Sequence, residues 1–258
     1  MYATDYFETK ILNLLRGISA TAPGTVYLGL YLNSPGEAGG GTEVSYAGYA
    51  RKPVVLSAPA AMSGGIGVQN VEEITYATTP SAVGSVTHLG LLDSLTGGNM
   101  LCYAELTEPL VLGAGEAPVL VAGEVQWWLT GHLCNAYKTK ILNLLRGINC
   151  AGFTPYLSLY NGDPESSGAE LAGGGYARVA MTFGAPAEQS TGQMMVQNTV
   201  RALTARATTA WGNWSHTVLF DAEANGQPVW SIPRTIPKEI RKGLMVVVEP
   251  GEFSVVVN

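Results

Sequence analysis

With 258 residues, the chain is long enough for one large domain or two small ones, and its 47% hydrophobic residues can supply apolar cores. Only 13% of the residues are charged, against about a quarter in ordinary soluble domains, which favours a protein that packs against neighbours. The net charge of −6 and the lack of a long basic stretch argue against a nucleic-acid partner.

Sequence features that would mark export, a membrane partner or a metal site are missing. The chain has no secretion signal and no run of the roughly 18 apolar residues that a spanning helix needs, so we expect no membrane partner. Cys102, Cys134 and Cys150 have neither CxxC spacing nor a His cluster beside them. We therefore expect no metal, no cofactor and no disulfide framework, and we interpret the cysteines as small buried residues.

The first predicted element is an amphipathic helix that begins near residue 5. Asp5 is expected to cap its N-terminus, with Glu8 three residues later in the position of a capping box. Gly17 suits the left-handed conformation that ends many helices. The apolar stripe that would face the core consists of Tyr6, Phe7, Ile11, Leu14 and Leu15.

Short strands separated by Gly-rich turns follow the helix, which is typical of a β-sandwich or a jelly roll. Glycine is frequent, with 32 residues, and the loops at 36–45 and 96–99 have the composition expected of turns. The predicted strands of this part of the chain are 26–32, 52–56, 74–77, 86–92, 100–106 and 124–130.

The same short sequence motifs then occur a second time in the same order, which indicates an internal repeat. The sequence TKILNLLRGI at 9–18 recurs without a change at 139–148, and GYAR at 48–51 recurs at 175–178. The offset between the copies stays between 127 and 130, so each copy is one complete unit with loop-sized insertions. We predict two tandem β-sandwich-like or jelly-roll-like domains, residues 1–131 and 132–258, each mainly β with one N-terminal helix.

The second copy is expected to repeat these elements with local differences. Its helix is predicted at about 136–146, where Lys138 replaces Glu8 and weakens the cap. A strand is predicted at 155–160, and the last predicted strand lies at 252–257. Because an unpaired apolar strand invites aggregation, we expect this last strand to close a sheet or to meet a neighbouring subunit.

No residue pattern in the chain indicates catalysis. His88 and Asp93, and likewise His216 and Asp221, are five residues apart, which on a strand places their side chains on opposite faces. We interpret the two histidines as half-buried structural residues bonded to the backbone or to a turn aspartate. No nucleophile elbow, metalloprotease motif or phosphate loop accompanies them, so we predict no catalytic residue.

A tyrosine and an arginine occupy the same place in both copies. Tyr49 and Arg51 match Tyr176 and Arg178. We predict a shared structural task, in which a buried ring and an arginine brace the preceding loop, and contact with a partner subunit is the alternative. Five tryptophans suggest a sugar-binding platform as another possibility, but tryptophans such as Trp127, Trp128 and Trp214 have no counterpart at the matching position, which favours copy-specific packing.

The motifs together resemble a family of small structural proteins of tailed bacteriophages that are described as tail fibre-like. The resemblance covers nearly all of each half and rests on segments 28–31, 37–42, 48–51, 86–93, 173–178 and 211–221. It implies a β-rich virion module without catalysis. The chain departs from the family's single-unit pattern by its duplication and by a charged insertion at 233–243, so its two unequal domains could occupy two quasi-equivalent sites or replace two separate polypeptides.

These observations predict a non-enzymatic structural protein of the phage virion, associated with the tail, a fibre or the baseplate. The expected partners are other virion proteins and further copies of the chain, and the expected location is the virion, assembled in the host bacterial cytoplasm. The alternatives are a capsid decoration or neck protein, and a module that binds host-surface glycans. A hydrolase is disfavoured, because Glu72 and Glu73 are the only adjacent acids and the second copy does not retain them.

Overall fold

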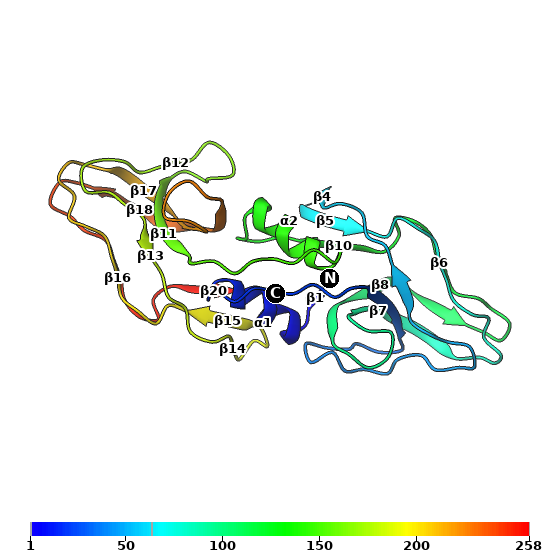
Figure 1. The fold of residues 1–258 in the computed structure, drawn as a ribbon. Helices are drawn as coiled ribbons and strands as arrows, with labels where there is room; N and C mark the ends of the chain where they lie inside the picture. The colour runs from blue at the N-terminus through cyan, green and yellow to red at the C-terminus, as the bar shows by residue number, and fades with distance from the viewer. Residues whose placement is uncertain (1, 63, 258) are drawn as a thin grey trace.

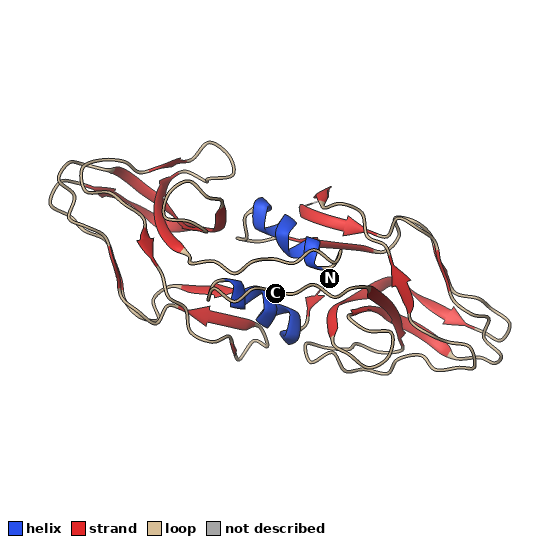
Figure 2. Cartoon of the chain, in the orientation of Figure 1, coloured by secondary structure: helices blue, strands red, loops and turns tan. Residues whose placement is uncertain are grey.

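The structure is a computed structural model that describes residues 2–62 and 64–257. It is mainly β, with one ten-residue helix near the start of each copy, α1 (Asp5–Leu14) and α2 (Asn135–Leu144), which confirms the predicted fold class (Figure 2). The strands of the first copy are β1 (Tyr2–Ala3), β2 (Val26–Tyr31), β3 (Lys52–Val54), β4 (Ala60–Met62), β5 (Gly65–Gln69), β6 (Ile74–Thr75), β7 (Gly84–Leu92), β8 (Met100–Leu112), β9 (Val119–Leu120) and β10 (Gln126–Leu129). Those of the second copy are β11 (Tyr156–Asn161), β12 (Ala169–Glu170), β13 (Val179–Ala180), β14 (Ala187–Glu188), β15 (Met194–Gln197), β16 (Ala202–Leu203), β17 (Gly212–Phe220), β18 (Pro228–Ile240), β19 (Val247–Val248) and β20 (Ser254–Val256).

The described part of each copy builds three antiparallel sheets. In the first copy these are a five-stranded sheet in the order β1-β8-β7-β2-β3, a three-stranded sheet β10-β5-β4 and the pair β6-β9. In the second copy they are the sheet β12-β11-β17-β18 with β13 also on β11, the sheet β14-β15-β20 and the pair β16-β19. The hairpins β7–β8 and β17–β18 shift register at the same place, after Val86 and after Trp214. The main sheets of the two copies therefore share one topology.

The two helices lie between two β-rich lobes, the first built around β7–β8 and the second around β17–β18 (Figure 1). Each helix packs against strands of both copies, because α1 contacts β8 and also β15, while α2 contacts β18 and also β5. One continuous cluster of buried residues spans both helices and both copies, and it includes Leu12, Trp127 and Leu142. Burial of apolar surface, at about 25 cal/mol per Å², therefore holds the two copies together around one core.

The segments that follow the helices pair with each other across an approximate two-fold axis. Ala20 and Cys150 are equivalent positions of the two copies, and each donates its backbone N–H to the carbonyl oxygen of the other, at 2.8 and 3.0 Å. The flanking contacts are reciprocal as well, from Ala22 N to Asn149 Oδ1 at 2.8 Å and from Gly152 N to Ser19 Oγ at 3.1 Å. A residue that pairs with its own counterpart lies beside the axis, so the fused copies are arranged like the subunits of a symmetric dimer.

The beginning of α1 differs from the sequence-based expectation. Thr4 and not Asp5 is the N-cap residue, and no side-chain capping bond forms at either helix. Thr4 Oγ1 donates instead to the carbonyl oxygen of Met100 at 2.5 Å, and Glu8 Oε2 accepts the backbone N–H of Met194 at 2.8 Å. The predicted capping box is therefore wrong, because a contact with the second copy takes the Glu8 carboxylate away from the helix end.

Other element ends agree with the predictions more closely. Gly17 follows the first helix with a left-handed φ of 76°. The last strand, β20, pairs with β15, so it completes a sheet within the chain, as one of the two expected outcomes requires. β8 extends to Leu112, beyond the predicted end at residue 106, because β7 continues alongside it as far as Gly84.

Candidate assembly site

Arg51 and Arg178, which the sequence singles out, each clamp a glutamate that sequence reasoning missed. In the first copy, Arg51 Nε and Nη2 donate to the two carboxylate oxygens of Glu43, at 2.9 and 2.7 Å. Arg51 Nη1 donates to the carbonyl oxygens of Ser94 and Gly97, in the turn between β7 and β8. A bidentate pair of this kind fixes geometry as well as charge. The arginine therefore ties the loop after β2 to the turn of the neighbouring hairpin.

The second copy repeats this clamp contact by contact. Arg178 Nε and Nη2 donate to the carboxylate of Glu170, at 2.9 and 2.8 Å, and Nη1 donates to the carbonyl oxygens of Ala222 and Asn225. Asn225 has a left-handed φ of 56°, a conformation that asparagine tolerates better than most residues. The two clamped glutamates are 127 residues apart, so the repeat offset is the signal in the sequence that would have found them.

Tyr49 and Tyr176 complete the clamps from the buried side. Tyr49 Oη donates to Glu43 Oε1 at 3.0 Å and accepts the backbone N–H of Leu30 at 3.0 Å. Tyr176 makes the two equivalent contacts in the second copy, at 2.9 and 3.1 Å. Burial raises the pKa of both phenols, so each keeps its proton and can donate it to the carboxylate.

The clamps hold their charges in partly buried surroundings. Burial opposes the ionisation of Glu170, but the hydrogen bonds from Arg178 and its neighbours outweigh it and lower the pKa of the carboxyl. In the first copy, the hydrogen bond to Glu43 raises the pKa of the Arg51 guanidinium. The side chains of Arg51 and Arg178 are only 11% and 8% exposed. Each pair therefore acts as a fixed tie between loops.

His88 and His216 lie on β7 and β17, and neither pairs with the aspartate five residues later. Nδ1 of His88 lies 2.8 Å from Thr87 Oγ1, and Nδ1 of His216 lies 3.0 Å from Ser215 Oγ. Each ring thus contacts the hydroxyl of the preceding residue, where the sequence suggested the backbone or a turn aspartate.

Asp93 and Asp221 stabilise the turns of the two long hairpins. Asp93 Oδ1 accepts the backbone N–H of Asn99, and Asp221 Oδ1 accepts that of Gln227, both at 2.7 Å. Asp221 Oδ2 also forms an ion pair with Lys140 of α2 at 3.1 Å. Burial opposes the ionisation of Asp221, but these partners outweigh it and lower the pKa of the carboxyl. The structure therefore does not bring the histidines and aspartates together into an acid–base site.

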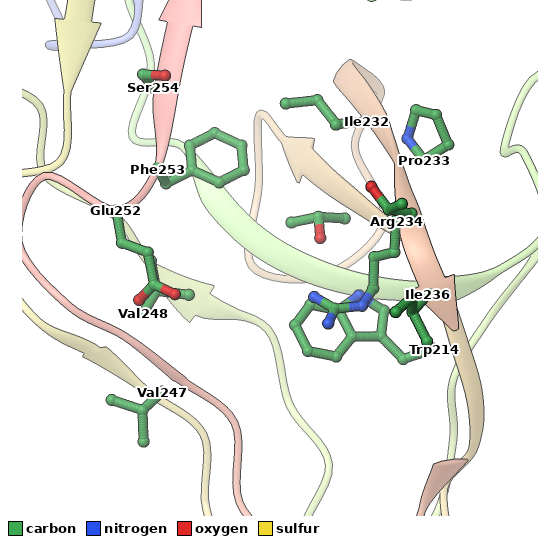
Figure 3. Close-up of a pocket in the computed structure, with 12 residues that line it drawn as sticks. Trp214, Ile232, Pro233, Arg234, Ile236, Val247, Val248, Glu252, Phe253 and Ser254 are labelled. Carbon is green, nitrogen blue, oxygen red and sulfur yellow. The ribbon is translucent and has the colours of Figure 1, made fainter. Parts of the chain in front are cut away.

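The tryptophans do not form an exposed platform. Trp128 is 38% exposed, and the other four are buried. Trp214 lies beneath Arg234, whose guanidinium carbon is 3.7 Å from the centroid of the ring (Figure 3). The first copy has Val86 and Leu106 at these two positions. The stacked pair is thus specific to the second copy, and it uses the aromatic face that a sugar would need.

An open cleft lies beside the long hairpin in each copy. In the second copy it has a volume of about 510 Å³ and lies between Arg234 and Ile236 on β18 and Glu252 and Phe253 before β20 (Figure 3). In the first copy the equivalent cleft, of about 570 Å³, lies between the outer part of β8 and residues 124–128. The two clefts thus occupy matching places, but the residues that line them differ between the copies.

The family comparison identifies the repeating unit. A family model described as "Podophage GP4 fiber I protein gp80" matches residues 2–127 and matches again at residues 132–256. The chain belongs to this family. It contains the unit of the podophage fibre family twice, as a tandem duplication, which confirms the resemblance to tail fibre-like phage proteins. A comparison with curated proteins finds no match.

Membership of the podophage fibre family suggests a structural and non-enzymatic protein of a phage particle. Within residues 2–62 and 64–257, no group of three or more His, Cys, Asp or Glu side chains is placed to hold a metal ion. Neither of the two described helices is long and apolar enough to cross a bilayer.

Proposed function

We propose that the chain is a non-enzymatic structural protein of a tailed-phage virion, located at the tail, a fibre or the baseplate, and that it acts through contacts with other virion proteins and with its own copies. The double match to the podophage fibre family carries this proposal. The low charge content and the exposed aliphatic side chains on strand edges, such as Val111 and Ile236, support a surface that neighbours cover. Assembly would take place in the host bacterial cytoplasm.

We also propose that Tyr49, Arg51, Tyr176 and Arg178 act within the fold and not as contacts to a partner. The support is their geometry, because each arginine donates its hydrogen bonds to a glutamate and to two carbonyl oxygens of the same copy. His88 and His216 are assigned the same internal role in this proposal.

Immunogold labelling of purified phage particles tests the location. An antibody against the chain is expected to place gold at the tail, and particles from a phage that lacks the gene are the control for specificity. Gold on the head or the neck would contradict the tail location. Absence of the chain from purified particles, measured by mass spectrometry, would contradict a virion role altogether.

A further inference from the structure

The two copies carry very different charge. Residues 1–131 contain four Lys or Arg and eleven Asp or Glu, a net charge of −7, whereas residues 132–258 contain ten and nine, a net charge of +1. More than half of this difference comes from one strand and its turn, because residues 105–115 carry two acids and no base, while residues 233–243 carry four bases and one acid. Copies that share a topology thus differ in charge mainly at one place.

These two stretches occupy the same position in the fold, so the interpretation of residues 233–243 as an insertion is wrong: they replace residues 105–115 one for one. Glu105 lies opposite His88 in the β7–β8 ladder, and Pro233 lies opposite His216 in the β17–β18 ladder. Both ladders continue from there to the ends of β8 and β18, where Gly84 pairs with Leu112 in the first copy. The charged residues of the two copies are therefore compared at equivalent positions of the strands, and the difference in charge is a difference between matching surfaces.

We name the two surfaces by their charge. The acidic edge lines the open cleft of about 570 Å³ in the first lobe, and its residues are Glu105, Glu108 and Glu124. The basic edge lies on β18 and the turn after it, and its residues are Arg234, Lys238, Arg241 and Lys242. Among the described residues, Glu105, Glu108, Lys238 and Lys242 are exposed and take part in no ion pair. Their charges are therefore available to a partner.

Prolines limit the pairing of these strands with a further strand. β18 is the last strand of its sheet, and β8 has a neighbour on its outer side only where β1 pairs with its first residues. Pro109, Pro233 and Pro237 remove backbone donors from the outer parts of the two strands. A partner would thus be recognised by side chains, which include the most exposed large aliphatic residue described in each copy, Val111 at 67% and Ile236 at 76%.

We infer that the basic edge of one chain docks onto the acidic edge of a second copy of the same chain. This inference rests on the proposed function for its place in the virion and deepens it by naming the partner. The two lobes lie at opposite ends of the molecule, with the helices between them (Figure 1). When two chains dock in this way, the pair still has one free acidic edge and one free basic edge. Further chains can add to these edges by the same contact, which produces a row of chains that all point in one direction.

The charge difference also selects against the symmetric alternatives. With equal lobes, the approximate two-fold axis would make contacts between two first lobes, between two second lobes and between unlike lobes equivalent. Like charges placed opposite each other disfavour the first two arrangements, and opposite charges favour the third. The duplication followed by charge divergence therefore gives the assembly a direction that a symmetric dimer does not have.

Sedimentation velocity of the purified full-length chain tests self-association. At about 0.01 M salt, where the screening length is about 30 Å, we expect a weight-average mass that rises with protein concentration. At about 1 M salt, where the screening length is about 3 Å, we expect the mass of one chain. A chain that stays monomeric at every concentration in low salt would overturn the inference.

Charge-reversal variants test which surfaces meet. The variant Glu105→Lys/Glu108→Lys makes both edges basic, and Lys238→Glu/Lys242→Glu makes both edges acidic, so neither is expected to self-associate. Their mixture contains two complementary contacts and is expected to recover the association of the wild type. Because the four side chains are exposed, the folds should be retained, and recovery in the mixture shows directly that both variants are folded.

A matched control separates these surfaces from net charge. The variant Glu188→Lys/Glu223→Lys changes the charge by the same amount at exposed residues outside both edges, and it should associate like the wild type. Self-association of either edge variant alone, or a mixture that stays monomeric, would contradict the pairing. A chain that is labelled at the tail of the particle but is monomeric in solution would overturn this inference and leave the proposed function intact.

Discussion

Glu8 and Lys138 occupy the same position of the two helices, and both are buried. Glu8 accepts a hydrogen bond from the Met194 backbone, whereas Lys138 donates to Asn135 of its own helix at 3.5 Å. Only the first copy therefore places a carboxyl group at this buried position, and that group contacts the second copy. Burial raises the pKa of Glu8 to about 8, and the nearby Glu37 and Asp5 carboxylates add to the effect against the bond from Met194.

The raised pKa of Glu8 predicts that stability depends on pH. The protonated form is favoured in the folded state, so its contribution is fully present below pH 4.5 and is lost as the pH rises towards about 8. Glu8→Gln keeps an oxygen that accepts the Met194 bond but cannot ionise. We expect the free energy of unfolding of this variant, relative to the wild type, to increase across that window, as measured by urea denaturation at several pH values. The exposed substitution Glu188→Gln should show no such trend, and a constant difference for Glu8→Gln would contradict the assignment.

The clamps predict a large effect for the loss of a single arginine. Arg178→Met leaves the Glu170 carboxylate without its bidentate partner, and we expect a loss of roughly 2–3 kcal/mol of unfolding free energy. Arg201→Met breaks an exposed pair with Glu249 and should cost about 0–1 kcal/mol. Chemical denaturation of both variants measures the contrast. Equal effects of the two substitutions would argue against an internal role of the clamp and favour a role at an interface.

The helices and sheets of the two copies contact each other, so the stability of each copy depends on the other. α1 packs on β15 and α2 packs on β5, so the core of each lobe includes a helix that belongs to the other copy. Gly152 lies so close to the backbone of Gly17 that a Cβ at position 152 would collide with it. The junction is thus packed as closely as a protein interior.

This shared core predicts one cooperative unfolding transition for the whole chain. Calorimetry should give a single peak, although the chain contains two copies of one unit. Leu12→Ala and its counterpart Leu142→Ala, both at fully buried positions, should each cost about 3 kcal/mol and shift that single peak. Leu95→Ala, at a position that is 46% exposed, should change stability by about 0.5 kcal/mol or less. Two separate peaks would show that the copies unfold independently.

The approximate two-fold axis that relates the two copies passes beside Ala20 and Cys150. Directly opposed residues that exchange both backbone hydrogen bonds have Cα atoms about 5.5 Å apart, a separation that a disulfide can bridge. Ala20→Cys is therefore expected to form a disulfide with Cys150 under mild oxidation, detected by peptide mass spectrometry. The double variant Ala20→Cys/Cys150→Ser is the control. A free thiol at position 20 after oxidation would contradict the symmetric arrangement.

Some features of the molecule follow from short-range patterns in the sequence. The ten identical residues at the start of each copy, the alternation of short apolar runs with Gly-rich turns, and the left-handed Gly17 predict the repeat, the mainly β class and the end of the first helix. The boundary at residues 131 and 132, the sandwich or jelly-roll arrangement and the internal role of the tyrosine–arginine pairs stay predictions. These local features could be read because they depend on the residue itself and its near neighbours.

Repetition and periodicity are visible along the chain, so two copies of one β-rich unit can be predicted without a structure. Packing in three dimensions sets the contacts of each helix with the sheets of the other copy, the turn of Glu8 away from the helix end, and the bonds of Arg51 and Arg178 to Glu43 and Glu170. The physical reason is that an apolar stripe or a charged side chain specifies that it needs a partner, but not which of two nearly identical copies supplies it. That choice depends on contacts between residues far apart in the chain, which packing settles for all of them together.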